Sequence, residues 1–179
     1  MDGENAVYLI TGISAAGKST VAQLLAERFD RAVHVKGDIY RRMVVSGRVH
    51  VRPGAPPEAE RQLDLRYRLG ASTADAYFDA GFTVAVQDIV MGPALATYVE
   101  RIASRPLYVI VLAPRTEVVG QRERLRGKAA YQADGPTIDD LDRYIRAETP
   151  RLGLWLDTSD QTPDETVNEI LARKDEALV

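Results

Sequence analysis

Cysteine is absent from this 179-residue chain, and histidine and tryptophan are scarce, with two and one residues respectively. The lack of cysteine excludes disulfide bonds, thiolate metal ligands and cysteine nucleophiles. With only His34 and His50 as imidazole donors, a zinc site is not expected. His34 falls inside a strand-like segment and is interpreted as a structural residue.

The chain also lacks an excess of basic charge and a long apolar run. It contains 23 basic and 26 acidic residues, for a net charge of −3. Proteins that bind nucleic acid through counterion release present a basic field, so a nucleic-acid partner is not expected. No stretch reaches the roughly 20 apolar residues that span a bilayer, and the first residues do not resemble a signal peptide. We therefore expect a cytoplasmic protein with no membrane partner; no sequence feature indicates an oligomeric state.

The composition, 45% hydrophobic and 27% charged, is typical of a globular protein, and the length fits one domain over residues 1–179. Short apolar runs predict strands at 6–11, 32–36, 82–89, 107–113 and 154–156. Helical spacing or capping signals predict helices at 18–29, 58–80, 93–103, 116–128, 138–148 and from 163 to about 172–178. Prolines and glycines predict an irregular loop between them, from 39 to 57. This alternation predicts an α/β protein with a parallel sheet covered on both faces.

The most specific motif follows the first predicted strand and opens the first predicted helix. Its residues are Gly12, Ile13, Ser14, Ala15, Ala16, Gly17, Lys18 and Ser19. In this context the spacing predicts a phosphate-binding P-loop, because the glycines let backbone N–H groups converge on phosphate oxygens. Lys18 is expected at the β- and γ-phosphates of ATP, Ser19 at Mg²⁺, and Thr20 near the α-phosphate. The alternative is a glycine turn before a helix, with Lys18 on the surface.

Acidic residues end the second and third predicted strands, as Asp38 and Asp88. Ligands of open α/β sheets bind at the carboxyl ends of the strands, so both carboxylates are predicted near the γ-phosphate. Asp38 is the candidate base for a hydroxyl acceptor. Asp88 is predicted to hold Mg²⁺ through a bound water, or to bind substrate together with Gln87.

Each of these positions also has a structural interpretation. Asp38 can cap a helix that starts near Ile39, and Asp88 can stabilise a turn before Pro93. Arg41, within the Tyr40-Arg41-Arg42 cluster, can contact an anionic or polyhydroxylated substrate, or be an exposed arginine without function.

An arginine-rich segment follows the fourth predicted strand and contains Arg115, Arg122, Arg124, Arg126 and Lys128. A guanidinium can stack on adenine or neutralise a phosphoryl group in transfer. The alternative is a solvated helix whose partners are Glu117 and Glu123. Together with the polar stretch that follows, the region 116–137 is predicted to form a lid.

Taken in order, these motifs resemble the small P-loop kinases, and most closely the chloramphenicol phosphotransferase-like proteins, which are related to gluconate and shikimate kinases. The resemblance extends to Leu156-Asp157-Thr158-Ser159 and the helix start at Thr162-Pro163. It implies a P-loop NTPase fold, a three-layer α/β/α arrangement with a five-stranded parallel sheet and the P-loop strand at its centre.

The resemblance also implies roles for individual residues. Asp38 would be the catalytic base, and Arg122 would pack against adenine. The segment Asp157, Thr158 and Ser159 would border the base on its other side. Arg124 or Arg126 would face the phosphates, which places Arg126 beside Lys18 and Asp38 in the catalytic set.

The implied function is ATP- and Mg²⁺-dependent transfer of the γ-phosphoryl group to a hydroxyl of a small molecule. The stretch from 44 to 57 and the Gln-Asp end of the third strand match no acceptor pattern, so the acceptor stays open among small alcohols, antibiotics included. A nucleoside or polynucleotide 5′-kinase and a regulatory P-loop ATPase without an acceptor are the alternatives. An Asn-Lys-x-Asp run after the fourth strand, which would indicate a guanine-specific switch, is absent.

Overall fold

The computed structural model describes residues 5–52, 54–125 and 135–179. Its parallel sheet has the strand order β2-β3-β1-β4-β5. The strands are β1 (Val7–Thr11), β2 (Ala32–Lys36), β3 (Thr83–Gln87), β4 (Leu107–Leu112) and β5 (Leu154–Leu156). Every residue of β1, β3 and β4 is buried, which explains their largely apolar sequences. The five-stranded parallel sheet and its central P-loop strand are thereby confirmed.

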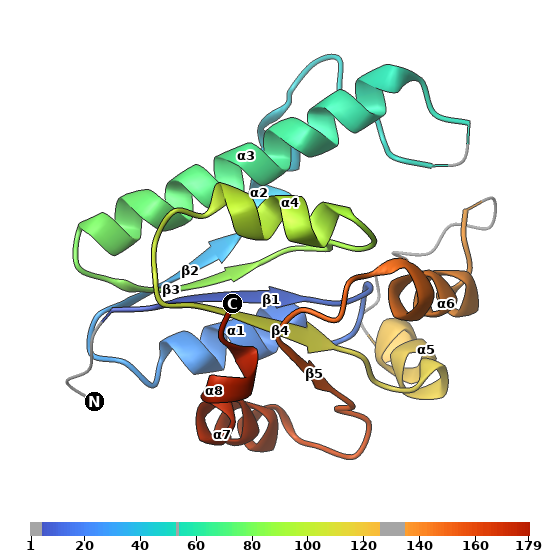
Figure 1. The fold of residues 1–179 in the computed structure, drawn as a ribbon. Coiled ribbons are helices and arrows are strands. Elements are labelled where there is room, and N and C mark those ends of the chain that lie inside the picture. The colour runs from blue at the N-terminus through green and yellow to red at the C-terminus, as the bar shows by residue number, and fades with distance from the viewer. Residues whose placement is uncertain (1–4, 53, 126–134) are drawn as a thin grey trace.

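Helices cover both faces of this sheet, as Figure 1 shows. One face carries α1 (Lys18–Ala26), α7 (Pro163–Ala172) and α8 (Lys174–Ala177), and the other carries α3 (Pro57–Asp79) and α4 (Ala94–Arg101). The remaining helices are α2 (Asp38–Met43), which directly follows β2, and α5 (Thr116–Leu125) and α6 (Ile138–Glu148), which lie together at the end toward which the strands point. The predicted three-layer α/β/α fold is confirmed.

Two helix starts follow directly from local chemistry. The hydroxyl oxygens of Thr137 and Thr162 accept the backbone N–H of Asp140 and Glu165, whose carboxylates bond back to the threonine N–H groups. These reciprocal capping boxes satisfy donors that a helix start leaves unpaired. Both helices therefore begin where the sequence predicts.

Two predicted elements differ clearly in the structure, and the end of a third lies outside the described residues. The segment expected to be irregular from 39 to 57 begins instead with α2, which is supported by ion pairs within its own turns. The last predicted helix is divided into α7 and α8, because Arg173 leaves the helical conformation. The helix predicted over 116–128 is described only as far as Leu125, and residues 126–128 lie outside the described part.

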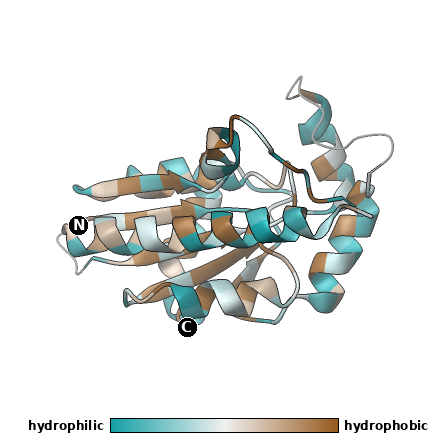
Figure 2. Cartoon of the chain, turned by 90° about the horizontal axis from the view of Figure 1, so that it is seen from above, coloured by the Kyte–Doolittle hydropathy of each residue, from teal (hydrophilic) through white to brown (hydrophobic). Residues whose placement is uncertain are grey.

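The long helix α3 spans the sheet and shows both hydrophilic and hydrophobic residues on its outward surface (Figure 2). Its buried residues are small or aromatic: Ala59, Tyr67, Gly70, Ala71 and Ala74. Within the described ranges, no helix combines the length and the apolar character that crossing a membrane requires.

Candidate functional site

The predicted phosphate and acceptor residues lie at one edge of the sheet. In the strand register, Ile10 of β1 and Lys36 of β2 both pair with Gln87 of β3. The three strands therefore end at the same level. The P-loop, Asp38 and Asp88 follow β1, β2 and β3 within a few residues, so the structure brings these elements together as the sequence predicted.

The P-loop owes its shape to three residues with positive φ. Gly12, Ala15 and Gly17 have φ values of 146°, 62° and 102°, a region that side-chain-bearing residues rarely occupy. A Cβ atom on Gly12 would also come within 2.5 Å of the Leu112 carbonyl oxygen of β4. Gly12 thus meets two requirements at once, a backbone conformation and a close approach between strands.

Lys18 is the first residue of α1 and is buried at the base of the loop, with 8% of its surface exposed. Its ammonium group donates a hydrogen bond of 2.7 Å to the Ile13 carbonyl oxygen across the loop. This rules out the alternative in which Lys18 lies on the surface. The next residues, Ser19 and Thr20, are exposed in the first turn of the helix, where backbone N–H groups lack helical acceptors and favour anions.

Asp38 opens α2 and is paired with two arginines of the same helix. Its carboxylate accepts hydrogen bonds from Arg41 Nε, at 3.0 Å, and from Arg42 Nε. Burial tends to raise the pKa of the Asp38 carboxyl, but these hydrogen bonds and charges outweigh it and hold the pKa below its usual value. The capping interpretation is wrong, because Gly37 occupies the N-cap and Asp38 is the first helical residue.

Asp88 has a partner that the sequence did not indicate. Arg66 of α3 donates Nε to Asp88 Oδ2 at 2.8 Å and Nη2 to Oδ1. Oδ1 also accepts the N–H of Ile89 at 2.7 Å, so the predicted turn-stabilising contact is present. Burial raises the pKa of Asp88, whereas for Arg66 the charge of Asp88 outweighs burial and raises the pKa of the guanidinium. Because both oxygens of Asp88 accept N–H groups, two of them from a guanidinium that stays protonated in proteins, we regard the pair as ionised at neutral pH.

Hydrogen bonds from α3 and from β1 also hold the turn after β3. Tyr67, next to Arg66 on α3, donates its hydroxyl to the Ile89 carbonyl oxygen at 2.8 Å. Thr11, the last residue of β1, both donates to the Val90 carbonyl and accepts the Val90 N–H. Gln87 is buried, with 6% of its surface exposed. This part of the site is therefore rigidly connected to β1 and to α3.

The opposite side of the P-loop is bordered by α5 and the segment after β5. Arg122 donates one hydrogen bond to the Ala16 carbonyl at 3.2 Å and another to the Thr158 carbonyl at 2.9 Å. Asp157 is exposed and accepts bonds from Ser159, and Thr158 is buried. Of the arginine-rich segment, Arg122 thus joins the P-loop to the segment Asp157–Ser159; its contact with adenine stays a prediction.

The other predicted members of this segment do not share that position. Arg124 is exposed on α5, and Arg115 pairs with Asp160 on the surface. Arg126, the remaining catalytic candidate, lies outside the described residues, as do Lys128 and the middle of the predicted lid from 126 to 134. The described beginning of that lid is a helix whose Val119 is fully buried.

Arg66 is the functional candidate that sequence reasoning missed. It lies one position from Tyr67, on the boundary between the buried and exposed sides of α3, and its side chain is 13% exposed. An arginine at such a boundary indicates a buried partner, because arginine is seldom buried unpaired. That signal was present in the helical pattern, but it does not identify the partner.

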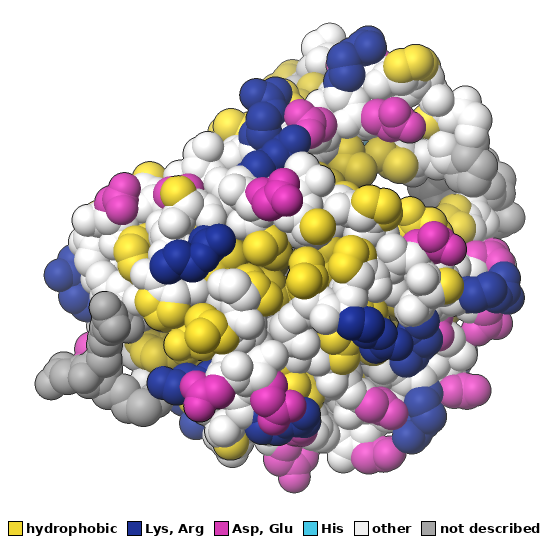
Figure 3. All heavy atoms as spheres, in the orientation of Figure 1, with side chains coloured by type: hydrophobic (Ala, Val, Ile, Leu, Met, Phe, Trp, Pro, Cys, Tyr) yellow, Lys and Arg dark blue, Asp and Glu magenta, His cyan; other side chains and the backbone are white. Residues whose placement is uncertain are grey.

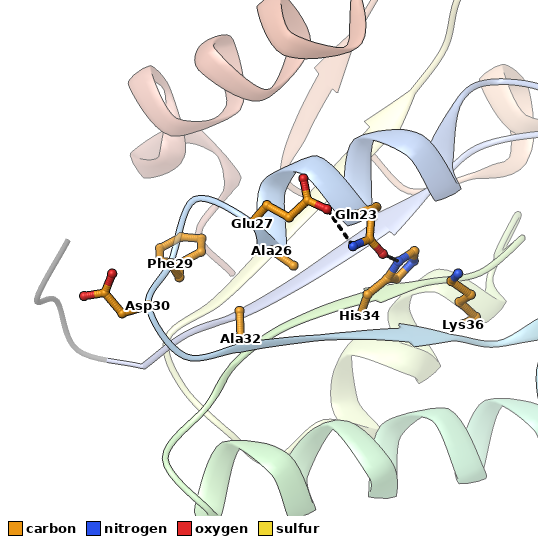
Figure 4. Close-up of a pocket in the computed structure, with 8 residues that line it drawn as sticks. All are labelled: Gln23, Ala26, Glu27, Phe29, Asp30, Ala32, His34 and Lys36. Carbon is orange, nitrogen blue, oxygen red and sulfur yellow. Dashed lines mark hydrogen bonds between the residues drawn. The ribbon is translucent and has the colours of Figure 1, made fainter.

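A shallow groove at the other half of α1 is separate from this site. It is lined by α1 and β2, and Figure 4 shows His34 and Gln23 directed toward each other across it. His34 Nδ1 lies 3.0 Å from Gln23 Oε1. Burial, and secondarily the charge of Lys36, lowers the pKa of His34 to about 4. His34 is therefore a neutral structural residue, in agreement with its interpretation from the sequence.

The P-loop at the end of a central parallel strand, with carboxylates after β2 and β3 on one side of it, defines the class: a P-loop protein of the small-kinase fold. A family model described as an AAA domain, AAA_33, matches residues 7–148, which run from β1 to the end of α6. The chain belongs to this family. No curated protein matches the sequence.

Solved structures share the fold over nearly the whole chain. The tunicamycin resistance protein of Deinococcus radiodurans is 18% identical, with a TM-score of 0.69 and 98% of each chain covered. APS kinase CysC of Mycobacterium tuberculosis, solved with AMPPNP and APS, is 16% identical, with a TM-score of 0.67 and coverage of 94% of this chain and 96% of that one. A gluconokinase of Sinorhizobium meliloti is 18% identical, with a TM-score of 0.62 and coverage of 96% and 92%. The predicted resemblance to small P-loop kinases is confirmed.

Proposed function

We propose that this protein transfers the γ-phosphoryl group of ATP to a hydroxyl group of a small molecule. The observation that carries the proposal is the placement of Asp38 at the same sheet edge as the P-loop lysine, with its pKa held low by Arg41 and Arg42. A P-loop alone serves any nucleotide-binding protein. An ionised carboxylate beside it adds a group that can accept the proton of an alcohol.

The nucleotide would be held by the P-loop and by the residues that border it. Lys18 would move from the Ile13 carbonyl to the β- and γ-phosphates, and Thr20 would lie near the α-phosphate. Arg122 would pack against adenine, opposite the segment 157–159, because its hydrogen bonds already join the loop to that segment. Arg124 and Arg126 remain proposed phosphate contacts.

Magnesium would be held mainly by the nucleotide and by Ser19, which is exposed beside the loop. Within the described ranges, no three or more acidic, histidine or cysteine residues gather as a metal cage. This fits Mg²⁺, which keeps several waters and binds through few protein ligands plus phosphates. Because Arg66 occupies both oxygens of Asp88, we propose that Asp88 acts through a metal-bound water. When bound, the ion supplies positive charge at the phosphate oxygens.

The acceptor would bind beside Asp38, with Arg41 and Gln87 as its polar contacts. Arg41 also lies 3.2 Å from His50 Nδ1, which connects α2 to the loop that follows it. That loop is in turn held to α3, since Gln62 bonds the Val49 N–H and the Gly47 carbonyl. The name of the tunicamycin resistance protein supports including antibiotic alcohols among the compounds tested.

A polynucleotide acceptor is disfavoured by the net charge of −3 and by the charges on one face of the molecule. On the face seen in Figure 3, the described lysine and arginine side chains alternate with aspartate and glutamate. Such a face does not offer the continuous basic groove that tracks a nucleic-acid backbone.

The test is a transfer screen with γ-labelled ATP and Mg²⁺ against sugars, nucleosides, aminoglycoside- and phenicol-type alcohols and a 5′-hydroxyl oligonucleotide. We expect one class of small alcohols to become labelled in step with ADP formation. Label on the oligonucleotide alone would identify a polynucleotide kinase. Label in inorganic phosphate alone, with every acceptor present, would identify an ATPase and contradict the proposal.

A further inference from the structure

The carboxylate of Asp88 lies between the guanidinium of Arg66 and the backbone of Gly37. Its Oδ2 atom accepts the Arg66 Nε hydrogen bond, and the same atom occupies the place where residue 37 would carry a Cβ. Its Oδ1 atom is held by Arg66 and by the Ile89 N–H. The carboxylate is therefore fixed at both oxygens, and one of them limits where residue 37 can lie.

The Asp88 carboxylate leaves no room for a side chain at residue 37. The Gly37 φ and ψ values of −57° and −31° are ordinary for any residue, so its backbone conformation does not demand glycine. Its N–H donates to the Gln87 carbonyl at 2.9 Å. The position of residue 37 is thus defined from one side by Gln87 and from the other by Asp88, and Asp38 is the next residue.

Arg66 pairs with Asp88 and lies near Asp38. Besides its ion pair with Asp88, its guanidinium is close enough to Asp38 for the charge of that residue to contribute to its raised pKa. The neighbouring Tyr67 holds the turn after Asp88. A buried ion pair is a poor source of stability compared with apolar packing of the same volume. Because Asp88 lies against the residue before Asp38, the pair can instead determine where the Asp38 backbone lies.

We propose that Arg66 is a positioning residue, which through Asp88 fixes the backbone at Gly37 and so the location of the Asp38 carboxylate beside the P-loop. This inference rests on the proposed function, in which Asp38 is the base. It predicts that loosening the pair lowers the rate of transfer and leaves nucleotide binding nearly intact, because the P-loop is not part of the contact.

The principal variant is Arg66→Met combined with Asp88→Asn, which removes both buried charges together and so avoids leaving one unpaired. We expect its thermal midpoint to stay near that of the wild type. Its kcat for γ-phosphoryl transfer to the alcohol found in the screen should fall at least about 10-fold, while the KM for ATP changes less than about twofold. Arg66→Lys keeps Asp88 and its proposed metal-bound water but cannot donate to both carboxylate oxygens, so its kcat should fall between those of the wild type and the double variant. A wild-type kcat in Arg66→Lys would assign the loss to the metal role of Asp88 and overturn the proposal. A double variant with the wild-type kcat would overturn the proposal.

The matched control is Arg68→Met, on the same helix. Arg68 pairs with Asp64 on the surface, where the two side chains are 59% and 48% exposed, and its loss should leave kcat within about twofold. An equal loss of kcat in this control would also overturn the proposal, since any change in α3 would then suffice.

A second readout does not depend on catalysis. In nuclear magnetic resonance spectra of the nucleotide-free protein, the backbone amides of Gly37 and Asp38 should shift in the double variant and keep their wild-type positions in Arg68→Met. Unshifted amides in the double variant would overturn the positioning role, even if the wild type labels no alcohol. Absence of label in the wild type, with shifted amides in the variant, would instead count against the proposed function alone.

Discussion

Arg66 and Asp88 form a buried ion pair, with 13% and 0% of their side chains exposed, between the middle of α3 and the residue that follows β3. Asp88 lies against Gly37, the residue before Asp38. The pair connects a helix on one face of the sheet to the edge where the P-loop lies. The candidate acceptor side therefore has a defined frame, in which Arg41, Arg42 and Arg66 each pair with a carboxylate.

Replacement of Gly37 by alanine tests this frame. The new Cβ would overlap the Asp88 carboxylate, so we expect a loss of about 1–3 kcal/mol in the free energy of unfolding, as in other overpacked sites. Urea denaturation measures it. Gly120→Ala in α5 is the control. A Cβ there would have its nearest neighbours, on Arg124 and Ile138, at 3.7 Å, so the change should be neutral or stabilise the protein by about 0.5–1 kcal/mol. Equal free energies of unfolding for the two variants would show that residue 37 can accommodate a Cβ, which would contradict this frame.

The pH dependence of transfer tests the environment of Asp38. Because its pKa is lowered, Asp38 stays ionised as the pH falls toward and below the ordinary value of 3.8. Arg41→Met removes one hydrogen bond and one positive charge, which raises the pKa of Asp38. The acid limb of kcat/KM should therefore move to higher pH. Arg61→Met, in an exposed pair with Glu58, should leave the limb in place, and a limb unmoved by Arg41→Met would speak against Asp38 as the base.

Arg122→Ala tests the adenine side. This change removes the hydrogen bonds to the Ala16 and Thr158 carbonyls, and the Kd for ATP should rise about 10-fold, equivalent to about 1.4 kcal/mol. Isothermal titration measures ATP and acceptor separately, and the acceptor Kd should change less. Arg115→Ala, at the start of α5 and paired on the surface, is the control. A larger effect on acceptor than on ATP would reject the assignment.

His34 makes a prediction for stability alone. Its pKa is lowered from 6.5 to about 4 in the folded protein, so between these values the unfolded chain binds a proton that the folded chain does not. The free energy of unfolding should therefore decrease as the pH falls from 6.5 to 4. His34→Gln should flatten this slope in denaturation curves, and the exposed His50→Gln should keep it. A His34→Gln slope as steep as that of the wild type would contradict the burial of a neutral imidazole.

The elements that sequence analysis located correctly are those with local causes. The capping boxes at Thr137 and Thr162, the unbroken apolar strand β4 and the glycine spacing of the P-loop are all readable within a few residues. The short helix α2 was anticipated only in the alternative that Asp38 caps a helix starting near Ile39. Six residues give little periodicity, and ion pairs between Asp38 and its own arginines support the helix.

In the candidate site, too, some residues could be predicted from the sequence and others could not. Lys18, Asp38 and Asp88 could be assigned to one edge of the sheet because strand ends alone determine it. The partner of Asp88 could not be predicted, since Arg66 is 22 residues away and meets it only through the packing of α3 on the sheet. Nor does the sequence indicate that the Asp88 carboxylate lies where a Cβ of residue 37 would be.

The central claim is that Asp38 accepts a proton from an alcohol while the P-loop lysine holds the phosphates. It is tested most directly by the rate of γ-phosphoryl transfer to the acceptor in Asp38→Asn, with ATP affinity measured alongside and Lys18→Ala as the inactive reference. We predict that Asp38→Asn binds ATP like the wild type and transfers about 10²–10⁴ times more slowly. Transfer at the wild-type rate in Asp38→Asn would contradict the account.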